Sequence, residues 1–109
     1  MPGGDFYKYL FPDLPEEEAK RYTAQLKNHS TACWHGVLTY PGYKFIPTTC
    51  LIPDSDFIIA TDIQKEQVAR EEREGVKIAV HELKGVGHAP IITIPGKVAD
   101  LLIDAAKAS

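Results

Sequence analysis

The sequence has little of what marks several large classes of protein. Its 109 residues include two cysteines, no run of 18 apolar residues, and no basic segment followed by an apolar one near Met1. Two cysteines without C-x-x-C spacing exclude a disulfide scaffold, so we expect Cys33 and Cys50 to be buried thiols in a reducing compartment. The missing apolar run excludes a transmembrane helix, and the missing signal segment favours a cytoplasmic location.

Basic charge is also scarce. The chain has 12 Lys and Arg residues against 15 Asp and Glu residues, which gives a formal net charge of -3. Without an excess of basic residues a protein has little electrostatic attraction for polyanions, so we expect neither nucleic acid nor anionic membranes as partners. The length allows one small domain with a single core.

Two apolar runs flank a helical pattern in the second half of the chain. Residues 46–52 form the first run, and residues 48–52 within it are β-branched and mostly apolar without alternation, which is typical of a strand covered on both faces. Residues 76–83 form a second strand pattern that is half polar, which indicates the edge of a sheet. Residues 61–74 between them are helical, and a right-handed crossover makes such strands parallel. The sequence therefore predicts an α/β fold with two parallel strands and flanking helices.

The helix between the strands carries signals at both ends. Thr61 and Gln64 have the spacing of a capping box, in which Thr61 caps the helix and Gln64 reaches back to it. Gly75 supplies the left-handed residue that commonly stops a helix. Ile63 and Val68 are its main candidates to face the core.

Two further helices are predicted outside this unit. One begins at Pro15, carries three glutamates in its first turn and ends near Asn28. Residues 30–36 are ambiguous between a short helix and a loop, and residues 39–45 read as a loop. The last helix begins near Pro95, and its apolar stripe should pack on the strands: Val98, Leu101, Leu102 and Ala105.

An acid and a histidine follow the two predicted strands. Asp56 comes shortly after the first strand and His88 shortly after the second. Ligands of open α/β sheets gather beyond the carboxyl ends of the strands, so these side chains could meet there. Asp56 would then fix one imidazole nitrogen, and the other nitrogen would act as a general base. The alternative is that both are ordinary loop residues, and Asp54 is a rival acid that we read as a solvated turn carboxylate.

The remaining polar and aromatic candidates predict no cofactor or metal. Cys33 shows no sign of the thiolate-favouring surroundings that a nucleophile needs. Trp34, Tyr40 and Tyr43 fit the wall of an apolar pocket and a core equally well. The other histidines lack the spacing of metal ligands, and we expect them to be surface or packing residues: His29, His35 and His81.

The predicted sheet is too small to stand alone. Independent stability requires three or more strands or a helical cover on the sheet faces. We therefore expect a further strand from elsewhere, supplied by self-association or by a complementing lobe, because exposed sheet edges recruit partners in this way.

Several ordered motifs resemble one family. Residues 10–19 place an aromatic residue and an Asp before a helix that begins with proline and acids, and residues 43–52 lead into the first strand. Asp56, Gln64 and Gly87-His88-Ala89-Pro90 follow in order, and the closing helix matches at Pro95, Val98 and Ala99. From residue 10 to residue 108 the chain resembles the carboxyl-terminal part of α/β-hydrolase fold proteins, in the small-esterase and hydroxynitrile-lyase-like branch.

This resemblance implies a catalytic role for two residues. Asp56 stands at the position of the family's catalytic acid and His88 at that of its catalytic histidine. It also implies a cap-like helical segment over residues 1–45 and a carboxyl-terminal lobe over residues 46–109. The implied chemistry is ester hydrolysis or lyase-type cleavage of a small carbonyl or ester metabolite, in a setting of secondary metabolism and without a cofactor.

The chain departs from the family in one important respect. The family's nucleophile lies in a G-x-S-x-G turn, and none of Ser30, Ser55 and Ser109 has that glycine context. We therefore expect an α/β-hydrolase-like protein that has the acid and histidine but lacks a nucleophile and an oxyanion hole, and is inactive alone. The alternatives are a non-catalytic binding or assembly module that pairs through its sheet edge, and a truncated gene product.

Overall fold

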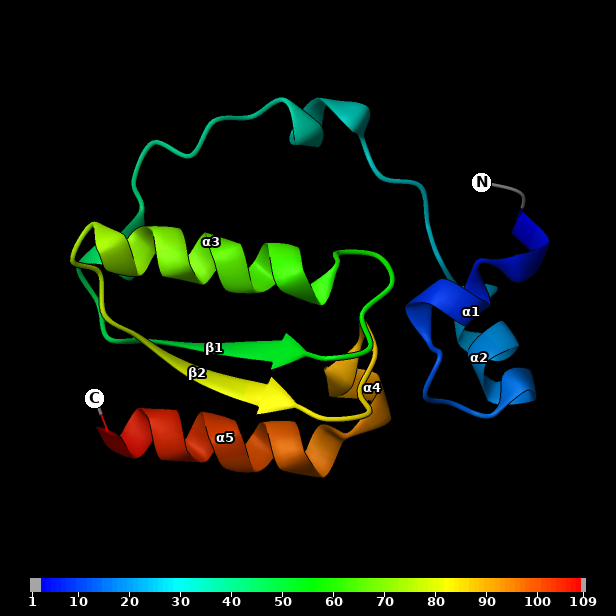
Figure 1. Cartoon of the computed structure of the whole chain (residues 1–109). Coiled ribbons are helices and arrows are strands. Elements are labelled where there is room, and N and C mark those ends of the chain that lie inside the picture. Colours follow the sequence, from blue (N-terminus) through cyan, green and yellow to red (C-terminus); the bar gives the residue numbers. More distant parts are fainter. Residues whose placement is uncertain (1–2, 109) are drawn as a thin grey trace.

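Two parallel strands lie between helices in the computed structural model, which describes residues 3–108 (Figure 1). The strands are β1 (Thr48–Pro53) and β2 (Ile78–Leu83), and the helix α3 (Thr61–Arg73) connects them. The remaining elements are, in chain order, η1 (Gly3–Asp5), α1 (Tyr7–Leu10), α2 (Glu16–Thr23), η2 (Thr31–Trp34), η3 (Gly42–Lys44), α4 (Pro90–Thr93) and α5 (Pro95–Ala108). The predicted mixed α/β class is confirmed.

The two strands pair in parallel along their whole length. The register runs from Thr48 opposite Ile78 to Pro53 opposite Leu83. Figure 1 shows α3 and α5 on opposite sides of this sheet. Because all strand arrows point the same way, the loops that follow β1 and β2 leave the sheet at one common end.

The connecting helix begins at Thr61 and ends before Gly75 as predicted, but its start is capped differently. Gly75 has a φ of 89°, and its N–H donates to the Glu72 carbonyl at 2.9 Å, so it is the left-handed stop. The prediction of a capping box at Thr61 and Gln64 is wrong. Ala60 is the cap residue, and the Thr61 hydroxyl donates to the carbonyl of Pro53 at 2.7 Å, which ties the helix start to the end of β1.

The closing helix packs its predicted stripe only in part. Pro95 begins α5, and Val98 and Leu101 are buried, whereas Leu102 is 65% exposed. Leu101 belongs to a core cluster with Leu83, the last residue of β2, and Val86, which follows it. The segment between Val86 and α5 includes the short helix α4, which the sequence did not predict.

The N-terminal helices form a second small cluster. Its buried members are Tyr7, Phe11 and Ala19, and the Tyr7 hydroxyl donates to Glu16 at 3.0 Å. Helix α2 ends at Thr23 and not near Asn28, so Leu26, which the longer helix would have packed, is 53% exposed. We call residues 7–23 the N-terminal unit.

Residues 24–47 cross from the N-terminal unit to β1 as a long connection above α3 (Figure 1). Every residue from 24 to 40 is exposed, including Trp34 at 79%. The expected burial of Cys33 is therefore wrong, while Cys50 on β1 is partly buried. Neither Trp34 nor Tyr40 is in a core. Exposure confirms the surface placement of three histidines: His29, His35 and His81.

Candidate acid and histidine site

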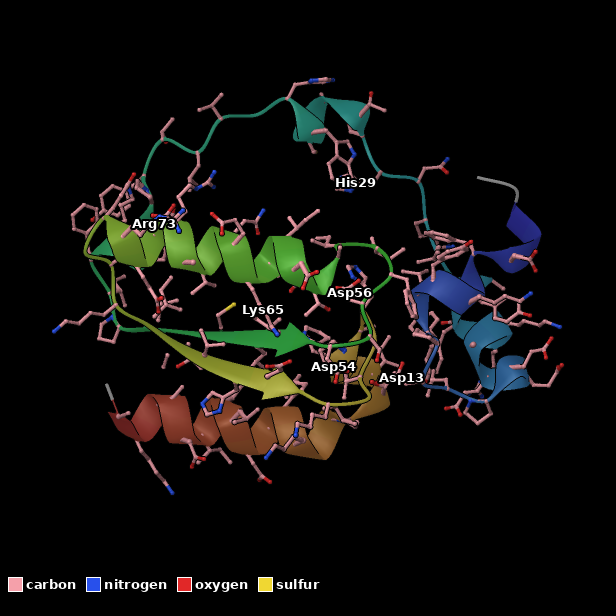
Figure 2. The ribbon with its side chains drawn as sticks, in the orientation of Figure 1. Asp13, His29, Asp54, Asp56, Lys65 and Arg73 are labelled. Carbon is pink, nitrogen blue, oxygen red and sulfur yellow. The ribbon has the colours of Figure 1, made fainter. Side chains whose placement is uncertain are left out.

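The predicted acid and histidine meet at the end of the sheet to which the strands point. Asp56 follows β1 and His88 follows β2, so parallel pairing brings both loops to one edge. Figure 2 shows Asp56 there, beside Asp54 and the labelled Asp13 of the N-terminal unit. The strand-end argument that linked Asp56 to His88 is confirmed as a matter of position.

The imidazole of His88 contacts both oxygens of the Asp56 carboxylate. Nδ1 lies 3.1 Å from Oδ1 and 3.0 Å from Oδ2. The Asp56 side chain is 4% exposed and that of His88 is 31% exposed. The acid is therefore shielded, while part of the imidazole is open to solvent.

Asp56 accepts further hydrogen bonds that hold it in place. The backbone N–H groups of Ile58 and Ile59 donate to Oδ1 at 2.8 and 3.0 Å. The Gln64 amide donates to Oδ2 at 2.9 Å and to the Ile59 carbonyl at 2.7 Å. A carboxylate that accepts from a backbone turn and from a helix side chain has little freedom to rotate, so its direction toward His88 is set before anything binds.

These bonds decide the charge of the acid. Burial raises the pKa of Asp56, but the hydrogen bond from His88 and those from Ile59 and Ile58 outweigh burial, so this pKa lies below its ordinary value. Asp56 is thus ionised at neutral pH and can only accept hydrogen bonds. Nδ1 of His88 must then carry a proton, which leaves the lone pair of a neutral imidazole on Nε2.

Such an arrangement can perform general-base chemistry. A histidine whose Nδ1–H is held by a carboxylate presents Nε2 in one tautomer and one orientation, and the carboxylate stabilises the imidazolium that forms when Nε2 takes a proton. The partial exposure of His88 allows another group to approach it.

Asp54, the rival acid, is the exposed turn residue that we expected, and it also makes two hydrogen bonds. Its Oδ1 accepts from the backbone N–H of Gly85 at 2.7 Å and from the Ser55 hydroxyl at 3.0 Å. It thereby fastens the loop after β1 to the turn after β2, where Gly85 has a φ of 70°. The sequence did not predict the bond to Gly85, because it depends on a turn distant in the sequence.

Sequence reasoning missed one neighbour of the site. Asp13 and Pro12, between α1 and α2, press against Gly87, the residue before His88. No spacing rule connects positions so far apart, so only the tertiary structure could show this contact. Gln64 was singled out, but for a cap and for its place in the family motif, and its bond to Asp56 became visible only with the fold.

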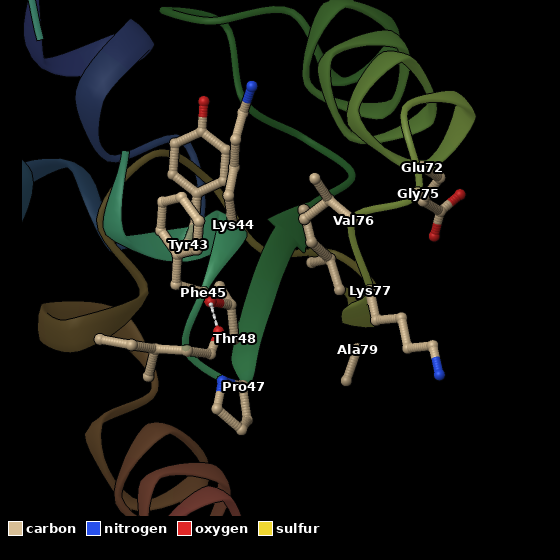
Figure 3. A pocket seen from close by; sticks show the side chains of 12 residues that line it. Tyr43, Lys44, Phe45, Pro47, Thr48, Glu72, Gly75, Val76, Lys77 and Ala79 are labelled. Carbon is tan, nitrogen blue, oxygen red and sulfur yellow. Dashed lines mark hydrogen bonds between the residues drawn. The ribbon is translucent and has the colours of Figure 1, made fainter. Parts of the chain in front are cut away.

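The larger hollows lie away from this site. Figure 3 shows one of about 810 Å³ among residues 43–48, the end of α3 and the start of β2. A second, of about 360 Å³, lies between β1 and α3 and is lined by Thr48, Cys50 and Val68 among others. Both open beside β1 or at the opposite end of the strands, so they are not the space that His88 faces.

Residues 3–108 contain neither a candidate membrane span nor a candidate metal cluster. None of the helices within residues 3–108 combines the length and apolar composition that crossing a membrane requires. Over the same residues, no three His, Cys, Asp or Glu side chains gather closely enough to hold a metal ion.

The fold and the site define a small mixed α/β protein in which an acid and a histidine meet beyond two parallel strands. Comparison of the chain with protein-family models, with curated proteins and with solved structures finds no match.

Proposed function

We propose that this chain is the acid-and-histidine part of an α/β-hydrolase-like esterase that acts on small carbonyl or ester metabolites. The observation that carries the proposal is the contact of His88 Nδ1 with both carboxylate oxygens of Asp56. The order of strand, acid, helix, strand and histidine in the family resemblance supports it. So does the exposure of the imidazole, which a base needs in order to meet a nucleophile.

The chain alone lacks the rest of such a site. Its sequence has no G-x-S-x-G. Ser30 lies in the exposed connection, and the Ser55 hydroxyl is committed to Asp54 at 3.0 Å. A base without a nucleophile or an oxyanion hole loses most of the rate enhancement of an acyl-transfer enzyme.

Ester hydrolysis tests this proposal directly. The purified chain should hydrolyse neither p-nitrophenyl acetate nor p-nitrophenyl butyrate above the rate of its His88→Ala variant. Turnover that His88→Ala abolishes would show a complete site and overturn the proposal of incompleteness.

A second test addresses the acid and histidine themselves. Proton NMR of the full chain should show a downfield resonance for the Nδ1–H of His88, because this proton sits in a charge-assisted bond. The resonance should disappear in Asp56→Asn. Its absence from the unaltered chain would remove the basis of the proposal.

The origin of the missing nucleophile can be read from nucleotides. An in-frame G-x-S-x-G in the coding sequence before Met1 would identify the chain as the back half of one hydrolase. A stop codon in frame between such a motif and Met1 would favour a truncated gene product.

A second candidate function is assembly through the sheet edge. In residues 3–108 the sheet contains β1 and β2 only, so the outer edge of β1 has no strand beside it. β1 is the more buried of the two strands, and the hollow of about 360 Å³ lies beside it. We propose that a second copy of the chain pairs there, because an unpaired strand edge is a template for another strand.

Two lysine variants distinguish the edges. Thr49 and Ala79 are both exposed and lie opposite each other, Thr49 on β1 and Ala79 on β2. Size-exclusion chromatography with light scattering should give a dimer for the unaltered chain and for Ala79→Lys, and a monomer for Thr49→Lys. An unaltered chain that is monomeric at all concentrations tested would refute this second candidate.

A further inference from the structure

The turn that carries His88 is held on both sides by the N-terminal unit. Gly87, before the histidine, is buried against Pro12 and Asp13. Ala89, after it, packs against the cluster of Tyr7, Phe11 and Ala19. Both chain neighbours of His88 therefore touch a part of the protein far away in the sequence.

The contact at Gly87 is too close for any side chain. A Cβ there would lie 2.6 Å from Pro12 Cδ, 2.7 Å from Pro12 Cγ and 2.8 Å from Asp13 Oδ1. The backbone of Gly87 does not require glycine for its φ, since the positive φ values belong to Gly75 and Gly85. The close approach of the N-terminal unit is therefore the reason that glycine is needed here.

Asp13 makes this contact at some cost. Its Oδ1 is buried and has no hydrogen-bond partner. A buried acceptor without a donor lowers stability, so the bonding of Asp13 does not by itself explain why it lies there. In this position Asp13, together with Pro12, contacts the turn just before His88.

We propose that Pro12 and Asp13 are positioning residues that fix the turn of His88 and so hold its imidazole against Asp56. They contact Gly87, the residue before the histidine, and Ala89, the residue after it, also packs against the N-terminal unit. The N-terminal unit thus controls whether the imidazole of His88 stays in contact with the carboxylate of Asp56. The inference concerns the same site as the proposed function, but it stands or falls on the Asp56–His88 contact and not on catalysis.

The first test adds one methyl group to the contact. In Gly87→Ala the added Cβ should separate the turn from Pro12 and Asp13, and this movement of the turn should displace His88. The downfield Nδ1–H resonance of His88 should be lost, and the pKa of Asp56, followed by its carboxyl carbon, should rise because the hydrogen bond from His88 lowers it. Gly96→Ala is the matched control, because nothing lies within 4 Å of a Cβ there.

A rescue variant separates positioning from loss of folding. Pro12→Ala removes the Cγ and Cδ atoms that an added Cβ at Gly87 would strike, and the remaining close atom, Asp13 Oδ1, can move because it ends a flexible side chain. The double variant Pro12→Ala/Gly87→Ala should therefore regain the Nδ1–H resonance and part of the lowered pKa of Asp56. Failure of the rescue in a folded double variant would overturn the proposal.

Pro12→Ala alone decides the matter if Gly87→Ala does not fold. It loosens the grip without adding bulk, so the Nδ1–H resonance should broaden and the pKa of Asp56 should rise by less than in His88→Ala. A fall in thermal stability with both signals unchanged would show that the contact is merely structural, and the proposal would be wrong.

Discussion

His88 and Asp56 are 32 positions apart in the chain, yet Nδ1 of the histidine lies 3.0 Å from Oδ2 and 3.1 Å from Oδ1 of the aspartate. The contact follows from topology, because two parallel strands deliver their following loops to the same end of the sheet. The carboxylate is nearly buried and the imidazole is not.

The pH dependence of stability should report Asp56. Its folded pKa lies below its ordinary value, so it stabilises the fold above the pKa of an unfolded aspartate. This contribution should be lost as pH falls through the folded pKa, where the native carboxylate is protonated. Urea unfolding at a series of pH values should therefore show Asp56→Asn less stable than the unaltered chain at neutral pH, with the difference vanishing in acid.

Asp54→Asn is the control for that experiment. It changes a carboxylate that bonds Gly85 and Ser55 and does not bond His88. The variant should keep the downfield Nδ1–H resonance of His88 that Asp56→Asn loses. Loss of the resonance in both variants would mean that the two carboxylates share the imidazole, contrary to the observed geometry.

Gln64 should be sensitive to charge because its amide donates to Asp56. Gln64→Glu would set a second carboxylate where a donor now stands, 2.9 Å from Oδ2. We expect a loss of about 1–3 kcal/mol at neutral pH and a rise in the pKa of Asp56. Denaturant unfolding measures the first and carboxyl NMR titration the second.

Gln67→Glu is the matched control on the same helix. Gln67 is exposed, so the same substitution should change stability by about 0.5 kcal/mol or less. Equal losses for the two variants would indicate a general effect of negative charge on α3 and would contradict a specific bond to Asp56.

The hydrogen-bond partners of Gln64 and Thr61 could not be predicted from local spacing. Their spacing is that of a capping box, but the Thr61 hydroxyl bonds Pro53 and the Gln64 amide bonds Asp56. Local spacing identifies polar groups that need partners, and tertiary structure chooses among the partners on offer. The end of the same helix was predictable, because a left-handed glycine such as Gly75 bonds a carbonyl of the last turn, and this bond needs no distant segment.

The same distinction separates the parts of the site. The strand-end rule needs only the order of strand, acid, helix, strand and histidine, so Asp56 and His88 were found together. The contact of Pro12 and Asp13 with Gly87 needs the docking of the N-terminal unit, which no periodicity reports. Likewise, Ile63 was expected to face inward and is 55% exposed, because helical periodicity does not report how much of α3 a two-stranded sheet can cover.

Gly75 should resist substitution for a backbone reason. Its φ of 89° lies in the left-handed region, where a Cβ is disfavoured, although nothing lies within 4 Å of that Cβ. Gly75→Ala should cost about 1–2 kcal/mol, and denaturant unfolding should show the loss. Gly96→Ala, within α5 and equally open, should be neutral or stabilising by about 1 kcal/mol or less. A Gly75→Ala variant as stable as Gly96→Ala would contradict the assigned conformation.

Ile52 should be the most sensitive position on β1, and two variants of graded size can show it. It is 1% exposed and lies just before the loop that carries Asp56, whereas Ile103 on α5 is 51% exposed. Removing one methyl group in Ile52→Val should cost about 0.5–1.5 kcal/mol, and Ile52→Ala about 2–5 kcal/mol, because a cavity replaces packed atoms. Ile103→Ala removes the same atoms from a half-exposed site, so urea unfolding should show a change of about 0.5 kcal/mol. Since small domains have little stability to lose, Ile52→Ala should leave much of the chain unfolded and abolish the Nδ1–H resonance of His88. Comparable midpoints for Ile52→Ala and Ile103→Ala would mean that β1 is not packed as the sheet requires, and that the loop of Asp56 is held by something other than this strand.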